Sequence, residues 1–124
     1  MLAASQELAM PASFDQNKLL ERCMGNGALM RKLLLAFLKS LPIEKESLEE
    51  AVQSEDWSSV ASISHKLRGT ALNMCAMPLS DAALQVKTAA RAFQKDFVAH
   101  RCIDLNQHFE MLMNALTKEA SIAL

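Results

Sequence analysis

The sequence predicts an all-α protein, folded as an antiparallel up-and-down four-helix bundle with one or two short N-terminal helices. Only three glycines and three prolines occur among the 124 residues. No stretch alternates apolar and polar residues with the period of two that marks a half-buried strand. Instead, apolar residues recur three and four positions apart over long segments, which is the pattern of helices that each bury one face.

The short N-terminal helices are expected before residue 25. The first dozen residues suit either a short helix that ends near Pro11 or a severed linker. Ser13 or Asp15 can then cap a helix that reaches about Met24, because both side chains accept hydrogen bonds from the free N–H groups of a first turn. The "GNG" sequence that follows is expected to stop this helix.

The first long helix carries a broad apolar stripe that a proline interrupts. Its stripe consists of Leu29, Met30, Leu33, Leu34, Phe37, Leu38 and Leu41. Pro42 follows directly, and the apolar pattern resumes after it at Ile43 and Leu48. We therefore expect a helix that is kinked or briefly broken at Pro42 and that ends near Ser54.

Three further helix boundaries can be placed from capping residues. The "SEDW" sequence starts the second long helix, with Ser54 or Asp56 as its N-cap. This helix is expected to end within residues 73–77, and Pro78 or Ser80 to begin the third. The third helix is expected to bury Leu79, Ala83, Val86, Ala90, Phe93 and Phe97, and the last helix Val98, Cys102, Leu105, Phe109, Leu112 and Leu116.

Composition bounds the possible functions. The net charge is −1, and no basic patch is present, so we expect no nucleic-acid or membrane-surface partner. No apolar run approaches the about 20 residues of a membrane span, and the first residues lack signal-peptide features, so we expect a cytoplasmic protein. Cys23, Cys75 and Cys102 lie far apart, which argues against a metal site or disulfide framework. The length suits one core, so residues 14–124 should form one domain after an N-terminal segment, residues 1–13.

One face of the second long helix combines a histidine with small residues. The stripe that should face the core consists of Val60, Ile63, Ser64, Leu67, Ala71 and Met74. At about 100° per residue, His65 points away from this stripe. The row that it shares with neighbours three and four positions apart consists of Ser58, Ser62, His65, Gly69 and Leu72, and Lys66 and Arg68 flank that row.

This arrangement suits a phosphoryl group. Neutral imidazole is a good nucleophile near pH 7, and phosphoryl transfer depends on positioning and charge neutralisation more than on covalent machinery. Arg68, three residues after His65, can reach an anion on the ring, and Lys66 can assist it. Gly69 removes the side chain that would crowd a phosphate or an approaching protein surface. The alternative is that His65 is a solvated residue on a polar face.

The segment "SHKLRGTALNMCAMPL" resembles the signature of histidine-containing phosphotransfer (HPt) domains. That signature has a small residue, His, any residue, Leu, Lys and Gly, followed later by an apolar residue, Gly-Ala and Leu. The corresponding positions here are Ser64, His65, Leu67, Arg68, Gly69, Met74, Ala76 and Leu79. The resemblance extends over roughly residues 14–116, and Arg68 replaces the usual lysine with charge retained.

The resemblance implies a phosphorelay intermediate. His65 would accept a phosphoryl group on Nε2 from the aspartyl phosphate of a receiver domain and pass it to another receiver's aspartate. The partners would be receiver domains of response regulators, of a hybrid sensor kinase, or of both. The chain is expected to have no cofactor of its own, with Mg²⁺ supplied by the receiver, and no ATP-dependent kinase activity, because it has no Gly-rich nucleotide loop.

Two positions depart from the family pattern. Cys75 stands where the family usually has glycine. If that glycine permits a special backbone angle, the end of this helix must differ, and a longer helix is one possibility. Lys87, on the following helix, occupies a position where relatives often carry Gln or Glu. It either adds a third cation at the phosphate or is simply solvated.

A docking surface for the partner is expected around the histidine. Its centre would be formed by Leu72 with Ser62, Gly69 and Ala76, and its rim by Lys66, Arg68 and Lys87. Two alternatives stay open. One is a helical adaptor or scaffold whose histidine is never phosphorylated. The other is the dimerising histidine domain of a sensor kinase, which fits less well because this chain supplies four long helices itself. We therefore expect a monomer, either free-standing or cut from a larger kinase.

Overall fold

The structure, a computed structural model, describes residues 13–122. Five helices account for most of them: α2 Gln16–Arg22, α3 Gly27–Gln53, α4 Trp57–Asn73, α5 Met77–Arg91 and α6 Lys95–Ile122. Within these residues no strand occurs, which confirms the predicted all-α class. One short helix, α2, precedes the four long ones, and the further helix considered for the first dozen residues lies outside the described part.

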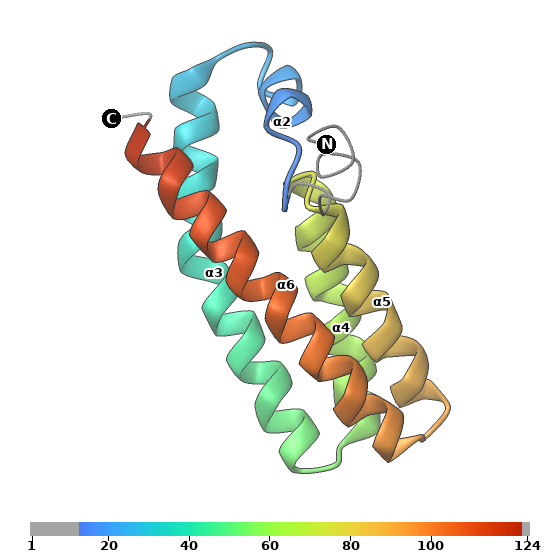
Figure 1. Cartoon of the computed structure of the whole chain (residues 1–124). Coiled ribbons are helices and arrows are strands. Elements are labelled where there is room, and N and C mark those ends of the chain that lie inside the picture. Colours follow the sequence, from blue (N-terminus) through green and yellow to red (C-terminus); the bar gives the residue numbers. More distant parts are fainter. Residues whose placement is uncertain (1–12, 123–124) are drawn as a thin grey trace, which may run out of the picture.

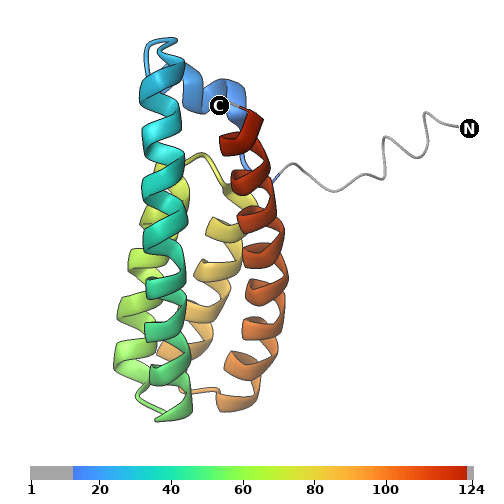
Figure 2. The ribbon, with the colours of Figure 1, turned by 90° about the vertical axis from the view of Figure 1, so that its left-hand side faces the viewer.

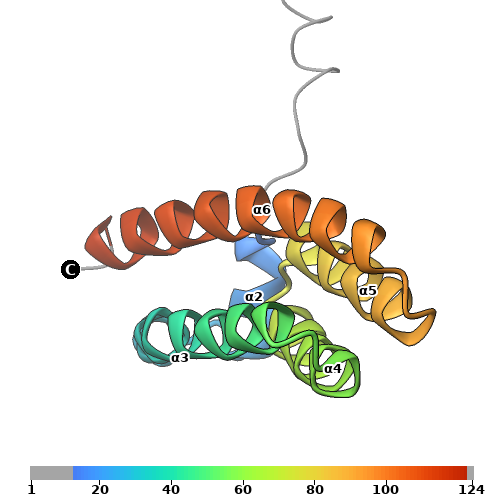
Figure 3. The same cartoon turned by 90° about the horizontal axis from the view of Figure 1, so that it is seen from below.

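The long helices α3 to α6 form an antiparallel four-helix bundle (Figure 1). Each packs against two others, in the cyclic order α3, α4, α5, α6 and back to α3. Figure 3 shows this arrangement from one end, with α5 and α6 on one side and α3 and α4 on the other. Connections this short join helices that lie side by side and run in opposite directions, so α4 and α5 are antiparallel neighbours.

The core is built from the apolar stripes of all four long helices and from α2. Its largest fully buried side chains are Leu19, Leu34, Leu41, Leu67, Met74, Leu79, Leu105, Leu112, Leu116, Val60, Val86 and Val98. Burying one such side chain stabilises the fold by about 1.5–3 kcal/mol. The predicted inner face of α4 is confirmed at Val60, Leu67 and Ala71, which have no exposed surface.

Helix α3 continues through Pro42 without a break. Residues 27–53 form one helix with the proline inside it. Proline lacks an N–H group and therefore leaves one carbonyl group of the preceding turn without its helical partner. Pro42 is exposed, so water can hydrogen-bond to that carbonyl group. The brief break that the sequence allowed at Pro42 is not formed.

Aspartate side chains cap two helices at their N-termini. Asp15 accepts a hydrogen bond from the N–H group of Lys18 at 3.0 Å, and Asp56 accepts one from Ser59 at 3.2 Å. Of the paired candidates, the aspartates therefore cap α2 and α4. Ser54, the alternative N-cap for α4, is the C-cap of α3 instead.

Helices α2 to α5 each end with a residue in the left-handed conformation. These residues are Met24, Glu55, Cys75 and Phe93, with φ of 57°, 56°, 60° and 55°. The N–H group of each of these residues and that of the next residue donate back to carbonyl groups of the last turn, which is the Schellman pattern. A residue with a side chain is strained there by roughly 1–2 kcal/mol. All four turns thus use a strained residue where glycine would be relaxed.

Cys75 takes the backbone angle that the expected glycine would take. Helix α4 ends at Asn73, so the prediction of a different helix end, such as a longer helix, is wrong. Two groups from the N-terminal part hold this turn. The N–H group of Asp15 donates to the Cys75 carbonyl at 2.8 Å, and Arg22 Nη1 donates to the Leu72 and Asn73 carbonyls at 3.0 and 3.2 Å. Burial of the Cys75 side chain offsets the strain.

The end of α5 differs from its predicted stripe. The helix stops at Arg91, so Phe93 lies in the turn and Phe97 lies on α6. Their exposed fractions are 74% and 52%, and the prediction that they line the core is wrong. The cause is the left-handed residue at position 93, which reverses the chain one turn before the apolar spacing ends.

Helix α2 lies across one end of the bundle (Figure 2). Its first residue reaches the last helix, because Gln16 Nε2 donates to Glu119 Oε2 at 2.7 Å. Its buried Leu19 belongs to the core. No helix within residues 13–122 combines the length and the apolar character that a membrane span needs.

Candidate functional site

His65 lies on the outer face of α4. Its side chain is exposed, whereas Ser64 beside it has no exposed surface. The exposed row predicted around the histidine is present, because Ser58, Ser62 and Gly69 are also exposed. The imidazole is therefore open to solvent on a helix whose opposite face is anchored in the core.

Lys87 of α5 lies directly against the imidazole. Its Nζ is 3.3 Å from Nδ1 of His65. The two residues meet because α4 and α5 pack side by side, and buried Val86 and Ala90 fix the register of α5 beneath the lysine. Lys87 is half-buried. The Lys87 ammonium therefore lies beside the histidine, and its action on a phosphate stays a prediction.

The other two predicted cations make no hydrogen bond to the imidazole among the described residues. Arg68 is half-buried on α4, one turn after the histidine. Lys66 is exposed, and its charge acts on Glu44 of α3. Burial raises the pKa of the Glu44 carboxyl group, while a hydrogen bond from Thr70 Oγ1 and the charge of Lys66 work in the opposite direction. Lys66 is thus close enough to α3 for its charge to act on Glu44.

An open pocket adjoins the histidine between α4 and α5. Its volume is about 440 Å³, and its lining consists of Trp57, Ser58, Ala61, Ser62, His65, Ala90, Arg91 and Phe93. We call it the α4–α5 pocket. It places a cation, Arg91, and an exposed aromatic ring, Phe93, in the same pocket as the imidazole.

Among the larger lining side chains, those of Trp57, Arg91 and Phe93 were not predicted as site residues. Arg91 carried a signal that was available. In an antiparallel pair with His65 facing Lys87, the residue one turn before the histidine faces the residue one turn after the lysine, which is Arg91. Phe93 carried none, because its place depends on the end of α5.

Gly69 faces open space. A Cβ atom added to it would meet no atom within 4 Å. Packing inside the molecule therefore does not require glycine here, although glycine in a helix costs about 1 kcal/mol relative to alanine. The open surface at Gly69 is available to an approaching molecule.

Ala76 does not belong to this surface. It has no exposed area, and its backbone forms the N-terminal cap of α5. Its predicted role in partner docking is therefore wrong, because a docked protein could not touch it. Leu72, the other apolar candidate, is half-buried and keeps part of its side chain on the surface.

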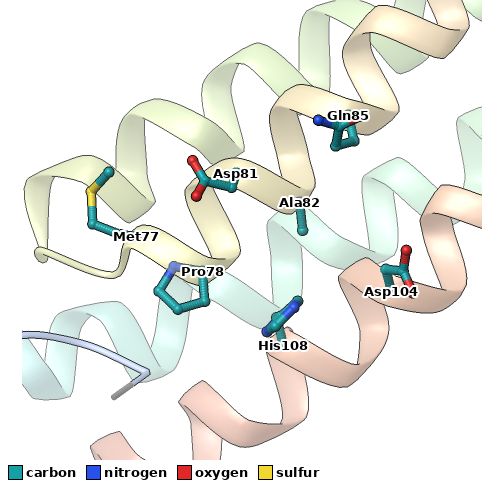
Figure 4. Close-up of a pocket in the computed structure, with 7 residues that line it drawn as sticks. All are labelled: Met77, Pro78, Asp81, Ala82, Gln85, Asp104 and His108. Carbon is teal, nitrogen blue, oxygen red and sulfur yellow. The ribbon is translucent and has the colours of Figure 1, made fainter. Parts of the chain in front are cut away.

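A second pocket, of about 360 Å³, lies between α5 and α6 and does not include His65 (Figure 4). It contains three titratable side chains, Asp81 from α5 and Asp104 and His108 from α6. Their side chains do not converge on one point. Across residues 13–122, no group of three or more acidic, histidine or cysteine side chains could hold a metal ion.

The cysteines take no part in the site. Cys23, Cys75 and Cys102 are all free thiols, and the first two are buried. Burial raises the pKa of the Cys102 thiol, and the charge of Glu49 adds to this effect. Since the thiolate is the reactive form, Cys102 is held in its unreactive form.

The structure thus combines an antiparallel four-helix bundle with an exposed histidine on its second long helix. The family model of the Hpt domain matches residues 32–119 of this chain. The chain therefore belongs to the Hpt domain family.

Two solved structures share the fold. The histidine-containing phosphotransfer protein B (HptB) of Pseudomonas aeruginosa PAO1 is 18% identical and has a TM-score of 0.82, with 90% of this chain and 97% of that chain covered. The HPT domain of a sensor hybrid histidine kinase from Shewanella is 19% identical and has a TM-score of 0.73, with 89% and 95% covered. No curated protein sequence matches this chain significantly.

Proposed function

We propose that this chain is a phosphorelay intermediate. His65 accepts a phosphoryl group on Nε2 from the aspartyl phosphate of one receiver domain and passes it to the aspartate of another. The observation that carries the proposal is the exposed imidazole of His65, held beside Lys87 on the bundle of an Hpt domain. The chain acts as a carrier and not as a kinase.

The chemistry needs little from this chain besides the nucleophile. An electron pair of Nε2 forms a bond to phosphorus, the bond between phosphorus and the aspartyl oxygen breaks, and its electron pair stays on the carboxylate. Onward transfer reverses these steps on a second receiver. Arg68 and Lys87 supply positive charge near the transferred group, since charge neutralisation is the main demand of phosphoryl transfer. The receiver supplies the Mg²⁺, and this chain holds no cofactor.

The docking surface for the receiver surrounds His65 on α4 and α5. Its exposed part at Ser62 and Gly69 allows close approach, and Leu72 offers apolar area. The α4–α5 pocket extends this surface to Phe93. A transient signalling contact of this kind buries less than about 1,200 Å², which a monomer of this size can present on one face.

The test is transfer from a radiolabelled receiver phosphate to the purified chain. We expect the wild type to be labelled and His65→Gln to stay unlabelled. His100→Gln is the matched control, because His100 is an exposed histidine of α6; it should be labelled like the wild type. Labelling of His65→Gln at the wild-type level would overturn the assignment. Binding of receivers without any labelling of the wild type would indicate an adaptor instead.

A second pair of variants tests the role of Gly69. Gly69→Arg should block transfer, because a long side chain would stand in the open space beside the histidine. Gly69→Ala should transfer at close to the wild-type rate. Both should unfold at slightly higher urea concentration than the wild type, since each residue favours the helix by up to about 1 kcal/mol over glycine. Full transfer by Gly69→Arg would show that the space above Gly69 is not used.

A further inference from the structure

Arg22 of α2 reaches the C-terminal end of the helix that carries His65. Its Nη1 donates to the carbonyl oxygens of Leu72 and Asn73, at 3.0 and 3.2 Å. The last turn of α4 contains no basic residue of its own, so a cation from another helix lies at its negative end. Two hydrogen bonds and this attraction hold the guanidinium group in place.

These bonds use one nitrogen of the guanidinium group and leave two others free. A guanidinium group has five N–H donors and no acceptor. Nε and Nη2 of Arg22 make no hydrogen bond within residues 13–122, and the residue forms no salt bridge there. The side chain is exposed. The edge that Nε and Nη2 form is therefore a free fork of donors, the shape that binds both oxygens of a carboxylate.

This fork lies at the end of α4 on the side of the proposed docking surface. Leu72 follows His65 by seven residues, so it lies about 20° from His65 around the helix and about 10 Å further along it. A docking contact of about 1,200 Å² covers about 600 Å² of each partner, a round patch with a radius of about 14 Å. A receiver centred on His65 would therefore reach the end of α4 at which Arg22 is held.

We propose that Arg22 is a contact residue for the receiver and binds a carboxylate group on the receiver's surface. The inference rests on the proposed function, and it adds a residue from outside α4 and α5 and the chemical group that this residue recognises. The transferred phosphoryl group is not that ligand, because the guanidinium is held about two helical turns from His65. Since the two carbonyl oxygens already fix the side chain, little of its conformational freedom is lost on docking.

The other role that this geometry allows is purely structural, with Arg22 as a cap of α4. Both roles predict that Arg22→Ala unfolds at a lower urea concentration, because the two carbonyl oxygens lose their donor and α4 loses a cation at its negative end. The roles differ in how the receiver affinity depends on salt. Contacts between exposed charges on two proteins are screened as the ionic strength rises, whereas the loss of a helix cap would alter the docking surface at every salt concentration.

Three variants of Arg22 and one control separate these roles. Arg22→Ala removes the cation, and Arg22→Glu reverses its charge. Arg22→Lys is the conservative variant, because it keeps the charge and loses the fork of donors. Lys118→Ala is the matched control, since Lys118 is an exposed cation of α6, and within residues 13–122 that helix does not pack against α4.

The first measurement is the Kd of a receiver domain for each protein at about 0.05 M and about 0.5 M salt. At low salt we expect Arg22→Ala to bind about tenfold more weakly than the wild type, the factor that one hydrogen bond between charged groups can supply. Arg22→Glu should bind more weakly still, Arg22→Lys should lie between Arg22→Ala and the wild type, and Lys118→Ala should match the wild type. At high salt the differences should shrink to about threefold or less. Equal affinities of Arg22→Ala and Lys118→Ala at low salt, or a loss of the same size at both salt concentrations, would overturn the inference.

The second measurement is the loading of His65 by phosphoramidate, a small phosphate donor that needs no receiver. We expect all five proteins to load at the same rate, because Arg22 touches the receiver and not the histidine. Slower loading of Arg22→Ala would show that the substitution disturbs His65 itself, and would overturn the contact role. If phosphoramidate loaded the wild type and no receiver labelled it, the relay function would fail and this inference with it. A receiver that labels the wild type and binds Arg22→Ala equally well would overturn this inference alone.

Discussion

The backbone and the side chain of Cys75 act on stability in opposite directions. The backbone has φ of 60°, in the region where a Cβ atom meets the following carbonyl oxygen. The side chain is buried, with an exposed fraction of 5%, and it packs in the core cluster. A glycine here would have no backbone strain but also no side chain to pack. The Cys75 thiol accepts the strain and gains apolar contacts in the core.

A pair of substitutions at Cys75 measures the backbone strain by itself. Cys75→Ala and Cys75→Gly both remove the thiol, but only glycine relaxes the left-handed conformation. We expect the glycine variant to be more stable than the alanine variant by about 1 kcal/mol. Urea unfolding of the two variants gives this difference directly. Equal midpoints would mean that Cys75 is unstrained.

At the scale of single helices, the N-cap of α4 is a titratable residue, Asp56, so the stability of the helix start depends on pH. Asp56 accepts hydrogen bonds from both the hydroxyl and the backbone N–H group of Ser59. These bonds favour the ionised carboxylate and lower the pKa of Asp56 below its ordinary value of 3.8. The helix that carries His65 thus begins with a charged cap at its positive end.

The sign of the resulting pH dependence follows from linkage. Because the folded pKa lies below the unfolded value, the contribution of Asp56 is present above about pH 4 and is lost as the pH falls through the folded pKa. Asn is an equally good cap but does not titrate. We expect Asp56→Asn to match the wild type near pH 7 and to lose less stability between about pH 5 and pH 2. Urea unfolding at each pH checks this, and parallel curves for the two proteins would contradict it.

The elements themselves were largely predictable, because helix starts and buried faces depend on local chemistry. In α4, for example, Asp56 marks the start of the helix, and the apolar stripe that includes Val60 and Leu67 marks its buried face. The ends of α2, α3 and α4 also lie close to their predicted positions. The end of α5 was missed, because Phe93 takes the left-handed conformation and no glycine marks the turn. Its apolar character alone predicted a core position for Phe93, but the side chain is 74% exposed.

At the scale of the whole molecule, the site depends on two helices and a turn that meet in space. The exposure of His65 follows from the periodicity of α4 alone, and the sequence placed it correctly. The contact with Lys87 required the register between α4 and α5, and the position of Phe93 required the end of α5. Neither feature follows from the sequence of a single helix. The family resemblance suggested that Lys87 lies near the histidine, and nothing in the sequence indicated the position of Phe93.

The α4–α5 pocket makes Phe93 the candidate anchor for a docked receiver. Its ring is 74% exposed and lines the same pocket as His65, and aromatic side chains of this kind contribute much of the binding energy at interfaces. Phe97 is the matched control, because it is also an exposed phenylalanine, 52% exposed, but lies in a different pocket beside Arg101.

We expect Phe93→Ala to weaken receiver binding about tenfold, which corresponds to about 1.4 kcal/mol, and to leave urea unfolding nearly unchanged. Phe97→Ala should change neither quantity. Transfer rates at increasing receiver concentration separate the binding effect from the chemical step, since the loss should disappear when the receiver is saturating. Loading by phosphoramidate should be the same in both variants. If Phe93→Ala and Phe97→Ala transferred equally well at low receiver concentration, the receiver would have to dock around His65 without using the α5–α6 turn.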